Sequence, residues 1–369
     1  MVTNNLIDAC TRDTLFFIGW CISLPLYFMT KHMTMLLIHY LKRRVSSLLF
    51  LSFLVLAVPA LLTGCGPVVE QAPERGSDSV VRDGADSMEV PVRHVRIVPH
   101  PRRWALWLQG AQPDAVAASA TDLVVVDYSA DGTDAAAFTP QQVARMQQGG
   151  RKVLCYFSIG EAESYRFYWD ARWKESPPPF LGPENPDWPE NYKVMYWHEQ
   201  WWDLVLRPYM DKILAAGFDG VYLDIVDAYW FWYEQGRDLQ LCADDMIRLV
   251  ARIANYMRTA GGADFIITPQ NAEGIFNDAS EASVARYLEV MDMIGVESLL
   301  FNVTPEDSVY RTTMLRKVAD AGKTVLNIEY IPLERMAEYR KALTTLPFAP
   351  VPYRAEPDRA LDSLAPQTP

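Results

Sequence analysis

The chain has 369 residues, half of them hydrophobic, and a formal net charge of −12 at pH 7. This length accommodates one large domain together with export and linker segments. The negative charge disfavours a nucleic-acid partner, because phosphate binding needs clustered lysine and arginine side chains. A neutral or cationic substrate suits such a protein better.

An export signal is predicted within residues 1–65. A basic stretch at 42–44 precedes an apolar run from Val45 to Leu62, and the run ends in the letters LTGC. This ending resembles a bacterial lipobox, in which the cysteine, here Cys65, is acylated and becomes the new N-terminus. We therefore expect an exported protein that a lipid holds on the bacterial envelope, at the periplasmic or cell-surface face and in the outer membrane. The alternative is a membrane helix that ends in a chance cysteine.

The rest of the chain divides by composition. A second apolar run lies upstream of the signal, and we expect translation to begin after it, at Met33 or Met35. Residues 66–95 are polar without periodicity, which predicts a flexible linker. We expect one folded domain over 96–350 and a disordered tail over the proline-rich residues 351–369.

Short apolar segments alternate with amphipathic helices from residue 103 onward, a pattern that predicts a parallel sheet. Helices that end in a glycine, such as Gly217 and Gly322, precede several of these segments. Neither a GxGxxG motif nor a Walker motif is present, which disfavours a nucleotide-binding sheet. Eight strands within about 250 residues predict an α/β fold, the (β/α)8 TIM-type barrel. The predicted strands are 103–108, 123–127, 152–158, 220–224, 264–268, 292–297, 324–329 and an eighth near 346–353.

Polar side chains follow most of these strands, and several are acidic. In a parallel barrel the carboxyl ends of all strands open on one face, so these side chains should converge in one mouth. Taken singly, any of them can be a helix cap or a turn residue; together they predict an acid-lined site. They are Asp127, Glu161, Asp224, Asp227, Gln270, Asn271, Glu297 and Glu329.

Such a mouth suits glycoside hydrolysis, in which one carboxyl group protonates the leaving oxygen and a second acts as nucleophile or as base for water. Burial and a neighbouring negative charge keep the acid protonated near neutrality. Few residues are available for other chemistry: apart from His100, where the predicted domain opens, His198 is its only histidine, and the five cysteines show no metal-binding spacing. Cys155 and Cys242 lie in apolar patterns that predict buried thiols. We expect neither a metal nor another cofactor.

Aromatic residues crowd two segments, where they can offer flat faces to sugar rings. We expect about half of the first set, between Tyr165 and Trp202, to be core, notably in the amphipathic pattern at 197–209. The second set, which includes Tyr229 and Trp230, follows Asp224 directly and favours substrate contact. The long proline-rich loop at 160–195 is typical of a lid or binding wall.

Several phrases of the chain resemble the family of endo-α-1,4-polygalactosaminidase, glycoside hydrolase family 114, and most closely its bacterial branch once labelled cysteinyl-tRNA synthetase-related. The synthetase label finds no support, because the chain lacks its nucleotide motifs and a basic surface. The resemblance covers residues 100 to about 340. The phrases are VVVDYS (124–129), CYFSIGEAESYR (155–166), NPDWPENY (185–192), GFDGVYLDIVDAY (217–229), PQNAE (269–273) and GVESL (295–299).

The resemblance implies a catalytic pair, an aspartate that ends strand four and a glutamate that ends strand six, matched here by Asp224 and Glu297. We expect Asp224 to be the nucleophile or base and Glu297 the acid, and the reverse assignment stays open. Where the family writes a Lys-Asn pair, this chain has Gln270-Asn271, which removes a positive charge and leaves the exact substrate open. The expected substrate-binding residues are Asp127, Tyr156, Glu161, Asp227, Tyr229, Trp230, Gln270, Asn271 and Glu329.

These observations predict a monomeric glycosidase that cleaves O-glycosidic bonds of an extracellular, amino-sugar-containing polysaccharide. Its expected partners are that polysaccharide and, through the lipid anchor, the membrane, with no nucleic acid. The alternative is a non-catalytic carbohydrate-binding lipoprotein with the same barrel, since a fold does not fix a function. A metal-dependent deacetylase or esterase is disfavoured by the near absence of histidine.

Overall fold

The computed structural model describes residues 100–367. The predicted signal, the lipid-accepting Cys65 and the linker at 66–95 lie outside the described residues. Between residues 100 and 367, no helix combines the length and the apolar character needed to cross a membrane.

Eight parallel strands form the centre of the fold, in two arcs with the orders β1-β2-β3-β7-β8 and β11-β10-β9. One junction between the arcs is a parallel bridge between Gln270, just after β8, and Gly295 of β9. At the other junction, the indole Nε1 of Trp104 in β1 donates to the carbonyl of Val351 in β11 at 2.9 Å. The strands are β1 (Trp104–Trp107), β2 (Leu123–Val126), β3 (Lys152–Ser158), β7 (Gly220–Asp224), β8 (Ile266–Pro269), β9 (Met293–Glu297), β10 (Thr324–Tyr330) and β11 (Val351–Ala355). This arrangement confirms the predicted α/β class and TIM-type architecture.

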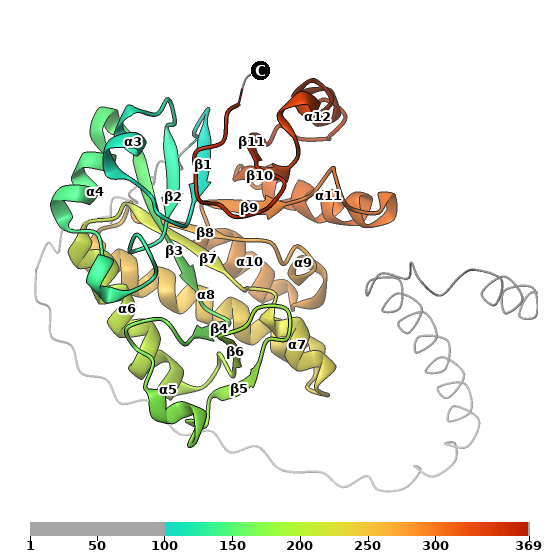
Figure 1. Ribbon diagram of the computed structural model, residues 1–369. Helices are drawn as coiled ribbons and strands as arrows, with labels where there is room; N and C mark the ends of the chain where they lie inside the picture. Colours follow the sequence, from blue (N-terminus) through green and yellow to red (C-terminus); the bar gives the residue numbers. More distant parts are fainter. Residues whose placement is uncertain (1–99, 368–369) are drawn as a thin grey trace, which may run out of the picture. The chain divides into compact units, whose positions relative to one another are not determined.

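Helices connect the strands and lie around them (Figure 1). Their ends follow ordinary capping chemistry: Asp238 caps the longest helix by accepting from the amide of Leu241 at 2.8 Å, and Gly217 ends α6 in the left-handed conformation, with φ 83°. The helices are α3 (Pro113–Ala118), α4 (Pro140–Met146), α5 (Glu199–Trp201), α6 (Arg207–Ala216), α7 (Ala228–Glu234), α8 (Leu239–Gly261), α9 (Ile275–Asp278), α10 (Glu281–Val290), α11 (Pro305–Asp320) and α12 (Met336–Leu343). A π-helical turn, Trp202–Leu206, joins α5 to α6.

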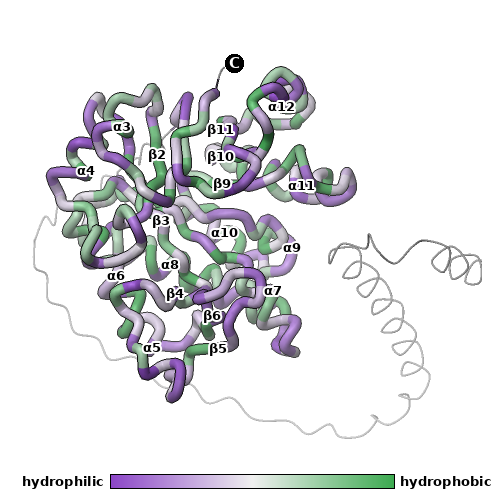
Figure 2. The backbone as a smooth tube through the Cα atoms, viewed as in Figure 1, coloured by the Kyte–Doolittle hydropathy of each residue, from purple (hydrophilic) through white to green (hydrophobic). Residues whose placement is uncertain are grey.

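The core lies inside the strands and between strands and helices. Figure 2 shows hydrophobic residues along β2 and hydrophilic ones on the neighbouring α4. Inside the barrel, the ring of Tyr222 stacks on Trp104 with centroids 6.3 Å apart, and Trp104 also contacts Tyr353 of β11. Cys155 and Cys242 are buried free thiols, as predicted.

The predicted loop at 160–195 contains a small antiparallel sheet of β4 (Glu161–Glu163), β5 (Leu181–Glu184) and β6 (Asn191–Val194), in the order β4-β6-β5. Its aromatic residues pack on one another: the rings of Trp169 and Tyr192 lie 4.8 Å apart. The following segment is helical and mostly buried on its aromatic side, with Trp201 0% exposed, so these aromatics are core as expected.

The prediction of a disordered tail over 351–369 was wrong, because its first residues form the eighth barrel strand. Strand β11 pairs in parallel with β10 through Ala355, which is later in the chain than the predicted 346–353. Pro352 is tolerated because β11 is the last strand of its hydrogen-bonded ladder, where one edge needs no amide donor. The chain then crosses to β1, where the carbonyl of Leu361 accepts from the amides of Leu108 and Gln109. The prediction was based on the high proline content and did not take account of apolar residues such as Tyr353 and Ala355, which are buried in this segment.

Candidate active site

Asp224 is the last residue of β7, and uncharged donors hold both of its carboxylate oxygens. The hydroxyl of Tyr156 donates to Oδ2 at 2.6 Å, and the amide of Ile225 donates to Oδ1 at 2.8 Å. Ile225 has φ 58°, a left-handed backbone that turns the chain sharply at this point. Burial, followed by the nearby charge of Glu297, raises the pKa of Asp224 to about 7.

Glu297 is the last residue of β9, and its carboxylate is held in a similar way. Asn271 donates its Nδ2 to Oε2 at 2.8 Å, while its own Oδ1 accepts from the amide of Glu297 at 3.0 Å. The hydroxyl of Tyr330, which ends β10, donates to Oε1. Asn271 has φ 55°, and this left-handed backbone aims its side chain at Glu297. The glutamate is thus fixed from both neighbouring strands.

The two carboxylates face the interior of the barrel at its mouth. Tyr222 points inward, because its ring stacks on Trp104 of β1 and its hydroxyl reaches Gly295 of β9, where a Cβ would lie 1.8 Å from it. Since side chains alternate along a strand, Asp224 faces the same way as Tyr222, and Glu297 the same way as Gly295. The donors to both carboxylates are uncharged hydroxyl and amide groups. None of these donors offsets the negative charge of an ionised carboxylate, as a lysine or arginine would.

Asp127 and Glu161 follow β2 and β3 and are paired with the buried Arg166 and the partly buried Lys193, respectively. Arg166 donates to both oxygens of Asp127 at 2.7 Å and also pairs with Glu163. Glu161 is 2% exposed and pairs with Lys193 of β6. In this arrangement the Asp127–Arg166 pair links the end of β2 to the segment after β4, and the Glu161–Lys193 pair joins β4 to β6 within the small sheet.

Glu329 lies on the opposite face of β10 from Tyr330 and is 0% exposed. It accepts hydrogen bonds from the amides of Leu300 at 2.8 Å and Phe301 at 3.3 Å, in the loop after β9. Burial raises the pKa of Glu329 to about 7. The structure therefore places it behind the mouth, where it fixes the segment that follows Glu297.

The remaining predicted residues lie around the mouth. Asp227 is exposed, Tyr229 is buried with its hydroxyl donating to Asp278 at 2.9 Å, and the partly buried Trp230 packs edge-on against Tyr229. Gln270 is 4% exposed and lies between β7 and β9. In the described part of the chain, no group of three or more histidine, cysteine, aspartate or glutamate residues could hold a metal ion.

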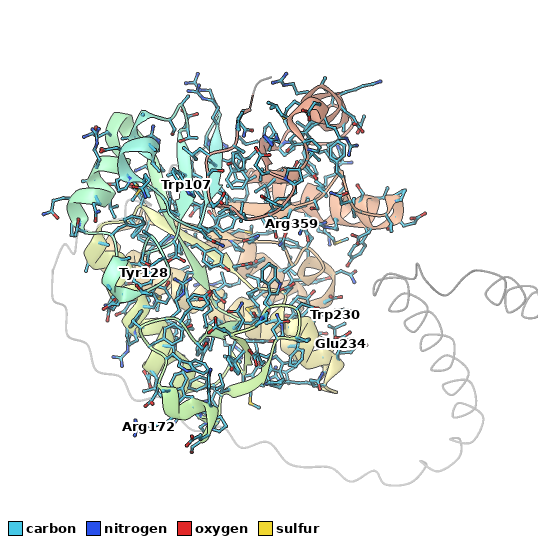
Figure 3. All side chains as sticks on the ribbon, in the orientation of Figure 1. Trp107, Tyr128, Arg172, Trp230, Glu234 and Arg359 are labelled. Atoms are coloured by element: carbon cyan, nitrogen blue, oxygen red, sulfur yellow. The ribbon has the colours of Figure 1, made fainter. Side chains whose placement is uncertain are left out.

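Sequence reasoning missed three residues that support Glu297. Tyr330 contacts it directly, and Arg311 of α11 donates to its carbonyl at 2.8 Å. Arg359, from the segment predicted to be disordered, stacks over the Tyr330 ring at 4.4 Å and donates to Ser298 Oγ at 3.0 Å (Figure 3). A signal was available for Tyr330 alone, since it directly follows the predicted strand 324–329; nothing in the sequence links Arg359 to the mouth.

Proteins from several other organisms are related to this chain in sequence. Uncharacterized proteins of Methanocaldococcus jannaschii and Thermotoga maritima are 38% and 32% identical to the chain, over 71% of it and 77% and 82% of their own lengths. One from Deinococcus radiodurans is 33% identical over 82% of this chain and 96% of its own.

Two solved structures share the fold. The glycoside hydrolase domain of PelA from Pseudomonas aeruginosa matches with a TM-score of 0.54 and 18% identity, covering 72% of this chain and 98% of that one. Aspergillus fumigatus Ega3, in complex with galactosamine, matches with a TM-score of 0.50 and 20% identity, covering 69% and 91%. Residues 87–351 match the model of glycoside-hydrolase family GH114. The chain therefore belongs to glycoside-hydrolase family GH114 and is a glycosidase.

Proposed function

We propose that this glycosidase hydrolyses O-glycosidic bonds of an extracellular, amino-sugar-containing polysaccharide, with Asp224 and Glu297 as its two carboxyl groups. The observation that carries the proposal is the electrostatic state of the pair. Both carboxylates face the mouth, both are held by uncharged donors, and the charge of Glu297 contributes to the raised pKa of Asp224. At neutral pH such a pair retains one proton, which is the state that glycoside hydrolysis requires.

The reaction follows from this state. The protonated carboxyl group donates its proton to the leaving oxygen as the glycosidic bond breaks, while the ionised one attacks the anomeric carbon or takes a proton from the attacking water. The sequence favours Glu297 for the first role and Asp224 for the second, whereas the raised pKa of Asp224 favours the reverse order, and the azide experiment below decides between them. Tyr156 and Asn271 keep the two groups in fixed orientations, which lowers the cost of reorganisation in the transition state.

Two observations support the substrate class: the negative charge of the mouth and the likeness of the fold to that of Ega3. An ammonium group suits a mouth that contains Asp224, Asp227 and Glu297, in a chain with a net charge of −12. The solved structure of Ega3, which shares the fold, is a complex with galactosamine. A polymer outside the cell fits the export signal that the sequence predicts at 1–65.

The test is reducing-end release from partly deacetylated galactosaminogalactan, poly-N-acetylglucosamine and neutral glucans. Glu297→Gln and Asp224→Asn should each lower turnover by about 10³-fold or more, because each removes a group that takes part in proton transfer or attack. Glu338→Gln, on the exposed surface of α12, is the matched control and should leave turnover unchanged. Full activity in the Asp224→Asn, Glu297→Gln double variant would refute the proposal.

The same variants separate hydrolysis from binding alone. A protein that only binds the polymer releases no reducing ends in any form and keeps its affinity in Glu297→Gln. The two roles are assigned with azide and Asp224→Gly: if Asp224 is a nucleophile, azide takes its place and a glycosyl azide of inverted configuration accumulates. No glycosyl azide, together with product of inverted configuration from the unmodified enzyme, would instead make Asp224 the base for water.

A further inference from the structure

We propose that Gln270 and Tyr222 together bind one ring hydroxyl of the sugar that lies between Asp224 and Glu297, and that Gln270 thereby selects the substrate. The inference deepens the proposed function and rests on it. It assigns a specific hydrogen-bonding task to two residues in the interior of the barrel.

The first step is the position of Gln270. Its amide donates to the carbonyl of Leu223 at 2.8 Å, which extends the β7–β8 ladder by one residue. Tyr222 and Thr268 are register partners on these strands, so Gln270 is level with Asp224 and faces inward with it. On its other side, Gln270 pairs with Gly295, two residues before Glu297. Its side chain is therefore flanked by both catalytic strands.

The second step is the state of the Gln270 side chain. It is 4% exposed, yet its Oε1 has no hydrogen-bond partner among the residues the structure describes. Leaving a buried acceptor unpaired costs roughly 1–3 kcal/mol, which a similarly shaped apolar residue would avoid. An acceptor that does nothing for the fold and faces the mouth is suited to a donor on the substrate.

The third step is a matching group on β7. The hydroxyl of Tyr222 is also buried without a partner in the described part of the chain. It occupies the space above Gly295, since a Cβ there would lie 1.8 Å from it. Gly295 is the residue with which the backbone of Gln270 pairs, so Tyr222 and Gln270 are both neighbours of the same glycine. Thr268 Oγ1, on the same face of β8 and one inward position deeper, is unpaired as well.

The fourth step is the choice of ligand group. Gln270 Oε1 only accepts, whereas the hydroxyl of Tyr222 has a proton to donate. A sugar hydroxyl satisfies both at once, because it donates one hydrogen bond and accepts others. An ammonium group only donates and would leave the tyrosine proton unpaired. The pair is therefore complementary to a ring hydroxyl, and the amino group of the sugar lies elsewhere, toward the carboxylates.

The experiment compares α-1,4-linked galactosamine oligosaccharides with counterparts in which each ring hydroxyl has been removed in turn. In the unmodified enzyme, removal of one particular hydroxyl should lower kcat/KM by about 10²-fold, the loss expected when a buried polar group is left unpaired. Gln270→Met should lower kcat/KM on the complete substrate by a similar factor and bring the two substrates within about threefold of each other. Tyr222→Phe should weaken the same discrimination.

Thermal stability distinguishes a binding role from a structural one. If Gln270 served only the fold, its replacement would lower the unfolding midpoint. Because Gln270→Met removes an unpaired acceptor, its unfolding midpoint should equal or exceed that of the unmodified protein. Gln147→Met is the control. Gln147 directly follows α4, and its Nε2 donates at 2.9 Å to the carbonyl of Gly217, which precedes β7, so its loss should not affect kcat/KM. A Gln270→Met variant that unfolds earlier, or that still discriminates between the substrates, overturns the inference.

The design separates this inference from the proposed function. If the unmodified enzyme cleaves the oligosaccharides and Gln270→Met discriminates as before, the inference fails and the function stands. If the unmodified enzyme cleaves nothing, the function fails, and calorimetric binding of the same oligosaccharides decides the inference. Equal affinities for the complete and deoxygenated forms, or no binding of either, then count against it.

Discussion

Two sides of the barrel mouth carry carboxylates at the ends of their strands, and they use them in opposite ways. On the β2–β3 side, Asp127 is paired with Arg166 and Glu161 with Lys193, both in buried contacts. On the β7–β9 side, Asp224 and Glu297 are held by a tyrosine hydroxyl each and by amide groups. One aspartate and one glutamate lie on each side, so the partner decides whether an acid serves the fold or the chemistry.

The cations on the first side come from the β4-β6-β5 insertion. Arg166, which follows β4, joins the insertion to the barrel by pairing with Asp127, whereas Lys193 of β6 pairs with Glu161 of β4 inside the insertion. A guanidinium that donates to both oxygens of a carboxylate fixes its geometry and favours its ionised form, which suits a brace. On the second side, uncharged donors fix the geometry without stabilising the charge to the same extent.

The largest effect on folding is expected from breaking the first side. Arg166→Met leaves Asp127 and Glu163 buried without their cation and should destabilise the protein by about 3–5 kcal/mol, measured by denaturant unfolding. Arg172→Met is the matched control, because Arg172 lies at the outer edge of the insertion and pairs with Asp170 in solvent (Figure 3). Its loss should leave the stability almost unchanged, because water screens an exposed ion pair. Similar losses of stability in the two variants would contradict the contrast between the buried Arg166 and the exposed Arg172.

A smaller effect, of opposite sign, is expected from neutralising the second side. The folded-state pKa of Asp224 is about 7, above its ordinary value of 3.8, so the folded protein binds this proton more tightly than the unfolded chain does. The resulting stabilisation is complete below about pH 4 and is lost as the pH rises toward 7. Asp224→Asn avoids that loss and should gain stability over the unmodified protein across this range, by up to about 4 kcal/mol.

Unfolding curves at pH 4 and pH 8 measure this difference. Asp114→Asn, whose carboxylate is exposed and pairs with Arg145, is the control and should show no comparable change with pH. If Asp224→Asn were instead less stable than the unmodified protein at pH 8, the carboxylate would be stabilised in the folded state, and the contrast between the two sides would be wrong.

The smallest effect is expected from Tyr330→Phe, which removes one donor to Glu297 and leaves the Asn271 contact in place. We expect kcat to fall by about tenfold, since one hydrogen bond to a charged group contributes roughly 1.5–3 kcal/mol and Asn271 keeps the carboxylate oriented. An unchanged kcat would show that Tyr330 only fills space.

Much of the barrel could be predicted from local patterns. Apolar runs such as 152–158 and 220–224 match β3 and β7 residue for residue, because a strand buried on both faces reads as a continuous hydrophobic run. Strand β11 was displaced in the prediction, since Pro352 reads as a break when the sequence is viewed without its neighbour β10. A proline is acceptable at the edge of a ladder because no amide donor is needed there, and only the assembled sheet shows that β11 lies at an edge.

The sequence by itself determined which residue types end the strands, and so that a mouth rich in acids would form. Only the tertiary structure decided which of these acids is neutralised, because Arg166 is 39 residues from Asp127 along the chain and Lys193 is 32 from Glu161. It also decided that Glu329 faces away from the mouth, and that Gln270 Oε1 and the hydroxyl of Tyr222 are buried beside Gly295 without partners. Charge pairing and burial depend on distances in space, which a strand-by-strand reading of the chain does not contain.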